Sequence, residues 1–198
     1  KMFEGKTYYP DELADKAERY REYFKDTGGV ALSGGEPLLQ AEFCSELFKI
    51  LKERGINTCL DTSGCILTDE VKTLLSYTDR VLLDIKYTTD ELYSKYVGCS
   101  LNEPLGFLSY LNLKRIPVTL RQVIIPGLND DEENIKRLAG IIRNHSCVDK
   151  TELLPFKKIC KVKYDNMRIA FPFADIPEPD EENMSKLNKI LAKAVTDF

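Results

Sequence analysis

Residues 30–37 of the 198-residue chain read Val-Ala-Leu-Ser-Gly-Gly-Glu-Pro. The first three residues form a short apolar run that suits a buried strand, and a glycine turn ends it. A helical pattern follows from about Gln40 to Glu53, with Gly55 as its stop. A strand, a tight turn and a helix in this order are the repeating unit of a parallel α/β sheet.

The same alternation continues along the chain. Predicted strands cover residues 57–62, 80–85, 118–125 and 150–156, and predicted helices cover residues 10–24, 69–76, 131–144 and 180–195. One or two further helices are expected between residues 89 and 114, Asn129 or Asp130 is the expected cap of helix 131–144, and the Pro-rich stretch 157–179 is expected to be irregular. Strands that are apolar on both faces indicate parallel pairing with helical crossovers. We therefore expect one α/β domain over residues 1–198, with a barrel-like or open parallel sheet.

Composition excludes several classes of protein. With 28 basic and 32 acidic residues the net charge is −4, which gives no electrostatic reason to expect a nucleic-acid partner. The short clusters Lys157-Lys158 and Lys161-Lys163 are interpreted as solvated loop charge. No apolar run approaches the ~18–20 residues of a membrane span, and no signal peptide is recognisable, so a cytoplasmic protein is expected. The six cysteines show no CxxC or CxxxC spacing, which favours free thiols over a zinc or iron–sulfur motif.

Polar residues follow one predicted strand after another. In a parallel sheet the carboxyl ends of the strands meet at one edge, where ligands bind. The residues expected there are Ser33, Gly34, Gly35, Glu36, Asp61, Thr62, Ser63, Asp84, Lys86, Arg121 and Lys157. The glycines allow close backbone approach to a ligand, and the carboxylates of Asp61 and Asp84 would repel each other unless a cation or a ligand ammonium lay between them. The edge therefore suits a zwitterionic, hydrogen-bonding small molecule.

Plainer roles remain open for several of these residues. Asp61 can cap the loop before the next helix, and Lys86 can be a solvated strand end. Arg121 lies inside an apolar strand and needs a partner, because an unpaired charge there is costly. His145, the single histidine, is expected to cap a helix or lie on the surface rather than act as a base.

Longer stretches around these residues resemble a known family. Segments 32–39 (Leu-Ser-Gly-Gly-Glu-Pro-Leu-Leu), 59–64 (Cys-Leu-Asp-Thr-Ser-Gly), 83–86, 121–127 and 152–156 are similar, in order, to radical S-adenosylmethionine (radical SAM) enzymes. They resemble most closely the pyruvate formate-lyase-activating enzymes. The resemblance implies a partial (β/α)6 barrel of parallel strands. In this family a [4Fe–4S] cluster on a CxxxCxxC loop binds S-adenosylmethionine and cleaves it reductively, and the 5′-deoxyadenosyl radical abstracts hydrogen from a glycine of the partner enzyme.

The resemblance also implies roles for individual residues. The cofactor-binding residues would be Gly34, Gly35, Glu36, Asp84, Ile85, Lys86, Arg121 and Lys157. Lys157 stands where the family often has a histidine, and a lysine can also donate a hydrogen bond there. A monovalent-cation site would use Asp61, Thr62, Asp84 and the backbone carbonyl of Leu82.

The implied partners are pyruvate formate-lyase and a flavodoxin- or ferredoxin-type electron donor, with no nucleic acid or membrane. The cluster cysteines and the first barrel strand are expected before Lys1, so this chain alone is expected to be inactive and to have an exposed, association-prone flank. Two alternatives remain open. One is an activating enzyme for another glycyl radical enzyme, and the other is a non-catalytic module that binds a partner protein through the barrel mouth.

Overall fold

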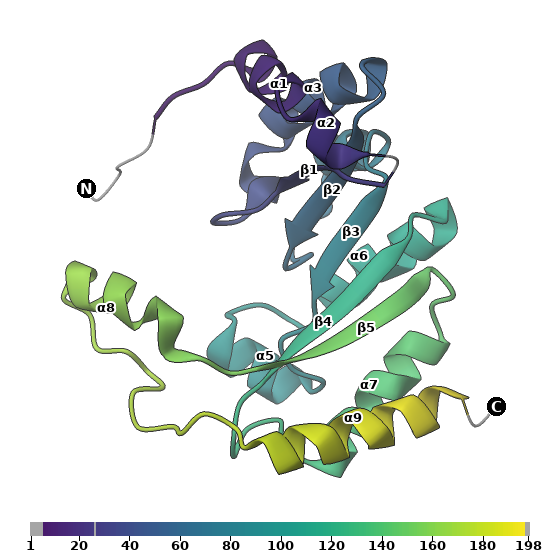
Figure 1. Cartoon of the computed structure of the whole chain (residues 1–198). Helices are drawn as coiled ribbons and strands as arrows, with labels where there is room; N and C mark the ends of the chain where they lie inside the picture. Colours follow the sequence, from purple (N-terminus) through teal and green to yellow (C-terminus); the bar gives the residue numbers. More distant parts are fainter. Residues whose placement is uncertain (1–5, 26, 197–198) are drawn as a thin grey trace.

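The computed structural model describes residues 6–25 and 27–196. Within them, five parallel strands form a sheet in the order β1–β2–β3–β4–β5, so that each strand pairs with its neighbour in the chain (Figure 1). The strands are β1 (Gly29–Leu32), β2 (Asn57–Thr62), β3 (Arg80–Asp84), β4 (Val118–Ile124) and β5 (Val148–Pro155). Helices connect successive strands, which confirms the expected α/β partial-barrel fold.

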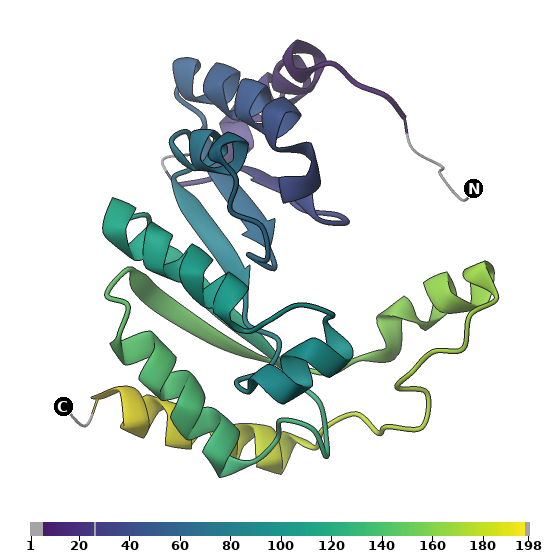
Figure 2. The same cartoon turned by 180° about the vertical axis from the view of Figure 1, so that it is seen from behind.

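The helices lie mainly on one side of this sheet. They are α1 (Pro10–Glu18), α2 (Arg21–Phe24), the 3-10 helix η1 (Pro37–Gln40), α3 (Ala41–Glu53), α4 (Asp69–Leu75), α5 (Asp90–Tyr96), α6 (Asn102–Lys114), α7 (Glu132–Arg143), the 3-10 helix η2 (Lys158–Cys160), α8 (Lys161–Met167) and α9 (Glu181–Thr196). Figure 2 shows α3, α6 and α7 in front of the strands, whereas in Figure 1 the face of β4 and β5 turned to the viewer has no helix over it. The sheet therefore has a covered face and an open face.

Alternation along β3 shows how the sequence separates the two faces. The side chains of Val81 and Leu83 are fully buried, while Leu82 and Asp84 remain partly exposed. Successive strand residues point to opposite faces, so Val81 and Leu83 pack under the helices and Asp84 points to the open face. Burial of these apolar side chains contributes about 1.5–3 kcal/mol each.

The amino-terminal helical stretch differs from the sequence expectation. The single helix expected over residues 10–24 is two helices, because α1 ends at Glu18 and α2 begins at Arg21. At the junction the amide of Tyr20 donates to the carbonyl of Ala17 at 2.9 Å, a tight turn of the 3-10 type. The apolar spacing continues across this turn, so periodicity alone did not reveal the break.

The cap of α7 also differs. Asp131 is the N-cap, and its carboxylate accepts a hydrogen bond from the amide of Asn134 at 2.7 Å. The expected caps lie in the preceding turn instead, where Asp130 accepts from the amide of Gly127 at 2.8 Å and Asn129 is fully buried. All three residues have side chains that favour caps and turns, so the sequence did not distinguish them.

The structure also bears on the expectations for the stretch 157–179 and for membrane-spanning helices. The stretch 157–179, expected to be irregular, contains η2 and the two-turn helix α8, which lies far out from the sheet in Figure 1. Within the described part of the chain, no helix has the length and apolar character needed to cross a membrane.

Candidate functional site

An open cavity of about 600 Å³ lies at the carboxyl ends of β1, β2 and β3 and beside Arg121 in the middle of β4. It is lined by Ser33, Gly34, Gly35, Glu36, Asp61, Thr62, Ser63, Asp84, Lys86 and Arg121. The sheet thus brings together residues that lie up to 88 positions apart in the sequence, 33 to 121. The expectation that these strand ends meet at one edge is confirmed.

The glycine turn after β1 presents free backbone groups to this cavity. Both Gly34 and Gly35 are exposed, and Gly34 has a φ of +126°, which disfavours any residue with a Cβ. No hydrogen bond joins the amide of either glycine to another described residue. A Cβ added at Gly35 would meet no atom within 4 Å. Unpaired amides in an open turn are a common feature of anion and cofactor sites.

Glu36 fastens this turn to the end of β2. Its Oε1 accepts from the hydroxyl of Thr62 at 2.7 Å and from the amide of Leu38 at 3.2 Å. Its Oε2 accepts from the hydroxyl of Ser63 at 2.6 Å and from the amide of Ser63 at 3.0 Å. A carboxylate offers about four lone-pair sites, so the protein already uses those of Glu36. Glu36 therefore sets the shape of the cavity wall, and its direct contact with a ligand stays a prediction.

Arg121 lies between the two carboxylates of the open face. Its Nη2 donates to Asp61, and its Nε donates to Oδ1 of Asp84 at 2.8 Å. The side chain of Arg121 is only 16% exposed. Burial works against its charge, but attraction to Asp84 and then the bond to Asp61 outweigh burial and raise the pKa of Arg121. The partner that Arg121 requires is thus the Asp61–Asp84 pair, and the guanidinium itself relieves their repulsion.

Lys86 is held at the same edge through both its side chain and its backbone. Its Nζ lies 2.6 Å from Oδ2 of Asp84. Its amide donates to the hydroxyl of Tyr93 at 3.2 Å, and its carbonyl accepts from Nδ2 of Asn129 at 3.2 Å. Burial raises the pKa of Tyr93, so its phenol stays protonated.

Sequence reasoning missed Asn129 and Tyr93 as supports of Lys86. Asn129 is fully buried, and it also donates to the carbonyl of Val123 and accepts from the amide of Ile125. Its position in a Pro-Gly-x-Asn turn after β4 was the available signal, because such turns use asparagine side chains to bind nearby backbone groups. Nothing in the spacing pointed to Tyr93.

The structure does not bring every expected residue into the cavity. Ile85 is fully buried on the helix side of the sheet, and Lys157 is exposed beyond the end of β5 and does not line the cavity. Leu82 is partly exposed but is also outside the lining. His145 lies in the turn after α7, where Nδ1 is 2.7 Å from the carbonyl of Ile141, as expected for a helix-end role.

The arrangement does not fit the implied cation site. Arg121 occupies the space between Asp61 and Asp84, and the hydroxyl of Thr62 is bound to Glu36. In residues 6–25 and 27–196, no cluster of three or more His, Cys, Asp or Glu side chains is arranged to hold a metal ion. We therefore derive no role for a monovalent cation.

The same finding applies to an iron–sulfur cluster. All six cysteines are free, and Cys44 and Cys147 are buried. Burial raises the pKa of Cys44 to about 11, which opposes the thiolate form that an iron ligand requires. The cavity does fit S-adenosylmethionine, because free backbone amides, carboxylates and two cationic side chains surround a space of about 600 Å³.

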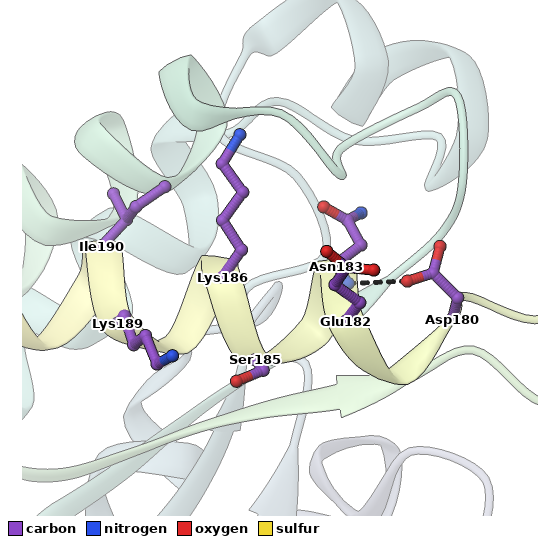
Figure 3. A pocket seen from close by; sticks show the side chains of 7 residues that line it. All are labelled: Asp180, Glu182, Asn183, Ser185, Lys186, Lys189 and Ile190. Carbon is purple, nitrogen blue, oxygen red and sulfur yellow. Dashed lines mark hydrogen bonds between the residues drawn. The ribbon is translucent and has the colours of Figure 1, made fainter.

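A larger cavity, of about 710 Å³, lies along α9 and is a poorer candidate. All its lining residues come from Asp180 to Ile190 on this one helix. In Figure 3 the side chains of Lys186 and Ser185 leave the helix in opposite directions, so the polar groups do not converge. The one hydrogen bond drawn, from the amide of Asn183 to Asp180, is an ordinary helix cap. Its residues show no arrangement for chemistry.

Comparison with known proteins identifies the family of the chain. The model of the Radical SAM superfamily matches residues 1–139. The pyruvate formate-lyase-activating enzyme of Clostridium pasteurianum is 39% identical over 191 residues, which cover 96% of this chain and 80% of the relative. The chain belongs to the pyruvate formate-lyase-activating family of radical SAM enzymes. The pyruvate formate-lyase 1-activating enzyme of Escherichia coli K12 is 36% identical over 190 residues, or 94% of this chain and 77% of the relative.

Solved structures support the radical SAM fold. A domain of the pyruvate-formate lyase-activating enzyme from Bacteroides vulgatus superposes with a TM-score of 0.68 at 23% identity, over 84% of this chain and 94% of that one. Streptococcus suis SuiB bound to S-adenosylmethionine gives a TM-score of 0.74 at 15% identity, over 99% of this chain and 43% of SuiB. At these identities the likeness shows the fold alone. The family membership makes the chain a radical SAM activating enzyme, an oxidoreductase, and the family implies S-adenosylmethionine and a [4Fe–4S] cluster as cofactors.

Proposed function

We propose that this enzyme activates pyruvate formate-lyase by installing a glycyl radical, with S-adenosylmethionine bound in the cavity at the ends of β1–β3 and beside Arg121 of β4. The observation that carries the proposal is the convergence of a free glycine turn, two carboxylates, Lys86 and Arg121 on one open cavity. The relatives at 36–39% identity are named for activating pyruvate formate-lyase, and this supports the choice of partner.

The residues of the cavity have distinct binding roles in this proposal. The backbone of Gly34 and Gly35 approaches the methionine end of the cofactor, where backbone groups bind the amino and carboxylate groups. Lys86 donates from Nζ to carboxylate or hydroxyl oxygens, since its side chain is 37% exposed at the cavity. Arg121 is bound to Asp61 and Asp84, so its main role is to hold these two carboxylates in place at the side of the cavity where the cofactor lies. Direct contacts by Ile85 and Lys157 belong to the proposal only as expectations from the family resemblance.

In this family the bound cofactor, together with a reduced [4Fe–4S] cluster, supplies the radical that abstracts hydrogen from the partner's glycine. Among the described residues, the cysteines are free and are not arranged to hold the cluster, so we assign none of them as a cluster ligand. To this chain we assign the binding and orientation of the cofactor. The electron donor that we propose is a flavodoxin- or ferredoxin-type protein.

The test uses protein made from the complete reading frame and reconstituted anaerobically with iron and sulfide. With S-adenosylmethionine, reduced flavodoxin and pyruvate formate-lyase, we expect a glycyl radical in the electron paramagnetic resonance spectrum of the lyase and matching 5′-deoxyadenosine. A radical on a glycyl radical dehydratase but not on the lyase would replace this partner with another one. Failure to bind iron would favour the non-catalytic partner-binding module.

Substitution of Lys86 tests the cofactor site. Lys86→Met keeps the length of the side chain but removes its charge-assisted hydrogen bond, so we expect about a tenfold weaker affinity for S-adenosylmethionine. Lys72→Met is the matched control, because Lys72 lies on α4 and pairs only with the exposed Asp69. Equal affinities of the two variants, measured by equilibrium binding to the reconstituted enzyme, would remove Lys86 from the site.

A further inference from the structure

Two cysteines that the cofactor site does not use face each other beside it. The Sγ of Cys99 donates a hydrogen bond to the Sγ of Cys65 at 3.2 Å, and both residues are partly exposed. They are 34 residues apart, so the contact is made by the fold and not by the local sequence. Among the described residues, no other hydrogen bond joins two cysteines.

The two sulfurs belong to loops that are packed to different degrees. Cys65 follows Gly64, whose φ is +68° and whose added Cβ would lie 2.7 Å from Cδ1 of Leu83, so this loop is packed tightly against the core. Cys99 follows Gly98, with a φ of +85° and no atom within 4 Å of an added Cβ, in the turn between α5 and α6. The backbone at Gly98 is therefore less tightly packed than the loop that carries Cys65.

We propose that Cys65 and Cys99 form a reversible disulfide, a modification site that cross-links the loop after β2 to the α5–α6 turn. A disulfide needs a sulfur–sulfur distance of about 2.05 Å, so the sulfurs must approach by roughly 1 Å, which rotation of the Cys99 side chain and movement of its open turn supply. The oxidant is a low-molecular-weight disulfide of the glutathione type. Intracellular proteins use such bonds mainly as transient, redox-responsive links.

The chemistry proceeds in two exchanges. The thiolate of Cys65 attacks one sulfur of the oxidant, forms a mixed disulfide and releases a thiolate that takes up a proton. Cys99 then loses its proton to solvent and attacks the Sγ of Cys65, which breaks the mixed disulfide, forms the Cys65–Cys99 bond and releases the second small thiol. Two protein thiols are oxidised, and one small disulfide is reduced to two thiols.

The hydrogen bond between the two thiols and the burial of Cys99 indicate which cysteine attacks the oxidant first. Cys99 is the hydrogen-bond donor, and burial followed by its bond to Cys65 raises the pKa of Cys99 to about 12, so Cys99 holds its proton until Cys65 has reacted. Cys65 accepts this hydrogen bond and does not need to donate one to Cys99. Cys99 is therefore the resolving cysteine.

The experiment treats the full chain, under native conditions, with oxidised glutathione, then alkylates the remaining thiols and measures intact and peptide masses. We expect protection of two of the six cysteines and a cross-linked peptide pair containing Cys65 and Cys99, reversed by a dithiol reductant. Cys99→Ser should trap one glutathionyl group on Cys65, and Cys65→Ser should abolish both products. Cys160→Ser is the control and should behave as the parent chain does, because Cys160 is partly exposed and lies outside the pair.

Three results would overturn the proposal. The first is alkylation of both Cys65 and Cys99 in the treated parent chain while another cysteine is oxidised. The second is a disulfide that includes Cys160. The third is a mixed disulfide that persists on Cys65 when Cys99 is present. These readouts do not depend on iron, cofactor or activity, so they remain distinct from the test of the proposed function.

Discussion

Arg121 shows how one residue joins stability to the cofactor site. It bridges Asp61 on β2 and Asp84 on β3 with a side chain that is 16% exposed. Loss of the guanidinium leaves two neighbouring carboxylates unpaired, so we expect Arg121→Gln to lower the free energy of unfolding by about 3 kcal/mol. Urea unfolding followed by circular dichroism at neutral pH measures this loss.

Arg80 supplies the matched control on the same open face. It binds Asp149 through two hydrogen bonds of 2.7 and 2.6 Å, but its side chain is 38% exposed. Exposed ion pairs contribute about 0–1 kcal/mol, so Arg80→Gln should cost much less than Arg121→Gln. Equal losses in the two variants would contradict a special role for the Arg121 bridge.

Substitution of the two glycines in the turn after β1 distinguishes an effect on stability from an effect on cofactor binding. Gly34 has a φ of +126°, so Gly34→Ala forces strain of about 1–3 kcal/mol into the turn. Gly35→Ala adds a Cβ that meets no atom within 4 Å, so its unfolding free energy should stay within about 0.5 kcal/mol of the parent. Since Gly35 lines the cavity, we expect Gly35→Ala to weaken S-adenosylmethionine binding. A Gly35→Ala enzyme with parental affinity, in a titration of the reconstituted protein, would exclude close cofactor approach at this glycine.

For single residues, the sequence predicted the need for an ion-pair partner better than it predicted the face to which a side chain points. Arg121 was expected to need a partner, because a charge in an apolar strand must be paired, and the structure supplies two. The family resemblance implied that Ile85 lies beside the cofactor, but alternation turns its side chain to the helix side, where it is fully buried. The alternation of side chains along the strand could be predicted from the sequence. Which face of the sheet lacks helices depends on the arrangement of the whole sheet.

At the scale of elements, Asp79 links the loop between α4 and β3 to the start of β2. Its carboxylate accepts from the amide and the hydroxyl of Thr58 at 2.8 and 3.1 Å, and it also binds Lys52. Burial works against this charge, but the bonds from Lys52 and Thr58 outweigh it and lower the pKa of Asp79. The stability that Asp79 contributes is therefore present above the pKa of an unfolded Asp, about 3.9, and is lost as pH falls through the lower folded value.

Asp79→Ala should therefore lower the free energy of unfolding by about 2 kcal/mol at pH near 7, and the deficit should shrink as the pH falls below about 4. Urea unfolding across this pH range measures the difference between variant and parent. Asp175→Ala is the control, because Asp175 is exposed and should change stability by less than about 0.5 kcal/mol at each pH. If the loss of unfolding free energy in Asp79→Ala were the same at every pH, the charge of Asp79 would not contribute to stability.

The elements differ in how well the sequence predicted them. The bounds expected for β2, residues 57–62, match the structure, because Gly55 and the polar turn at Ser63 delimit a short segment with Cys59 and Leu60 at its centre. Helix α8 was missed, because Lys161–Met167 carries exposed charge and has no fully buried side chain to create an apolar stripe. The ring of Tyr164 in α8 packs against Phe171, just beyond the helix, with ring centroids 5.1 Å apart. Local sequence does not record such contacts.

At the scale of the whole molecule, the observed strand order agrees with a general rule for parallel sheets. Short right-handed crossovers place consecutive parallel strands side by side, and the observed order β1–β2–β3–β4–β5 agrees. The same rules predicted that strand ends would share one edge, as the cavity shows. They did not place Lys157, because its position depends on the path of the chain after β5, where strand geometry no longer constrains it.

The molecule also divides into a core and a projecting segment of unequal stability. Residues 157–179 lead from β5 out to α8 and back to α9 (Figure 1). Phe171 joins this segment to the body through the ring of Phe156, 6.4 Å away, and Phe156 is 5% exposed. Local segments with few buried contacts open with less free energy than the global transition requires.

Limited trypsin digestion tests this division, because Lys163 and Arg168 lie in or beside α8. Aromatic contacts contribute about 0.5–1.5 kcal/mol each, so Phe171→Ala should speed cleavage in this segment by about tenfold and change global unfolding by much less than a core truncation does. Phe107→Ala removes a fully buried ring of α6 and should cost about 3–5 kcal/mol, with faster cleavage throughout the chain. If Phe171→Ala lowered global stability as much as Phe107→Ala and left the cleavage pattern unchanged, the segment would belong to the cooperative core. A local effect would instead show that the sheet folds without help from the segment beside its open edge.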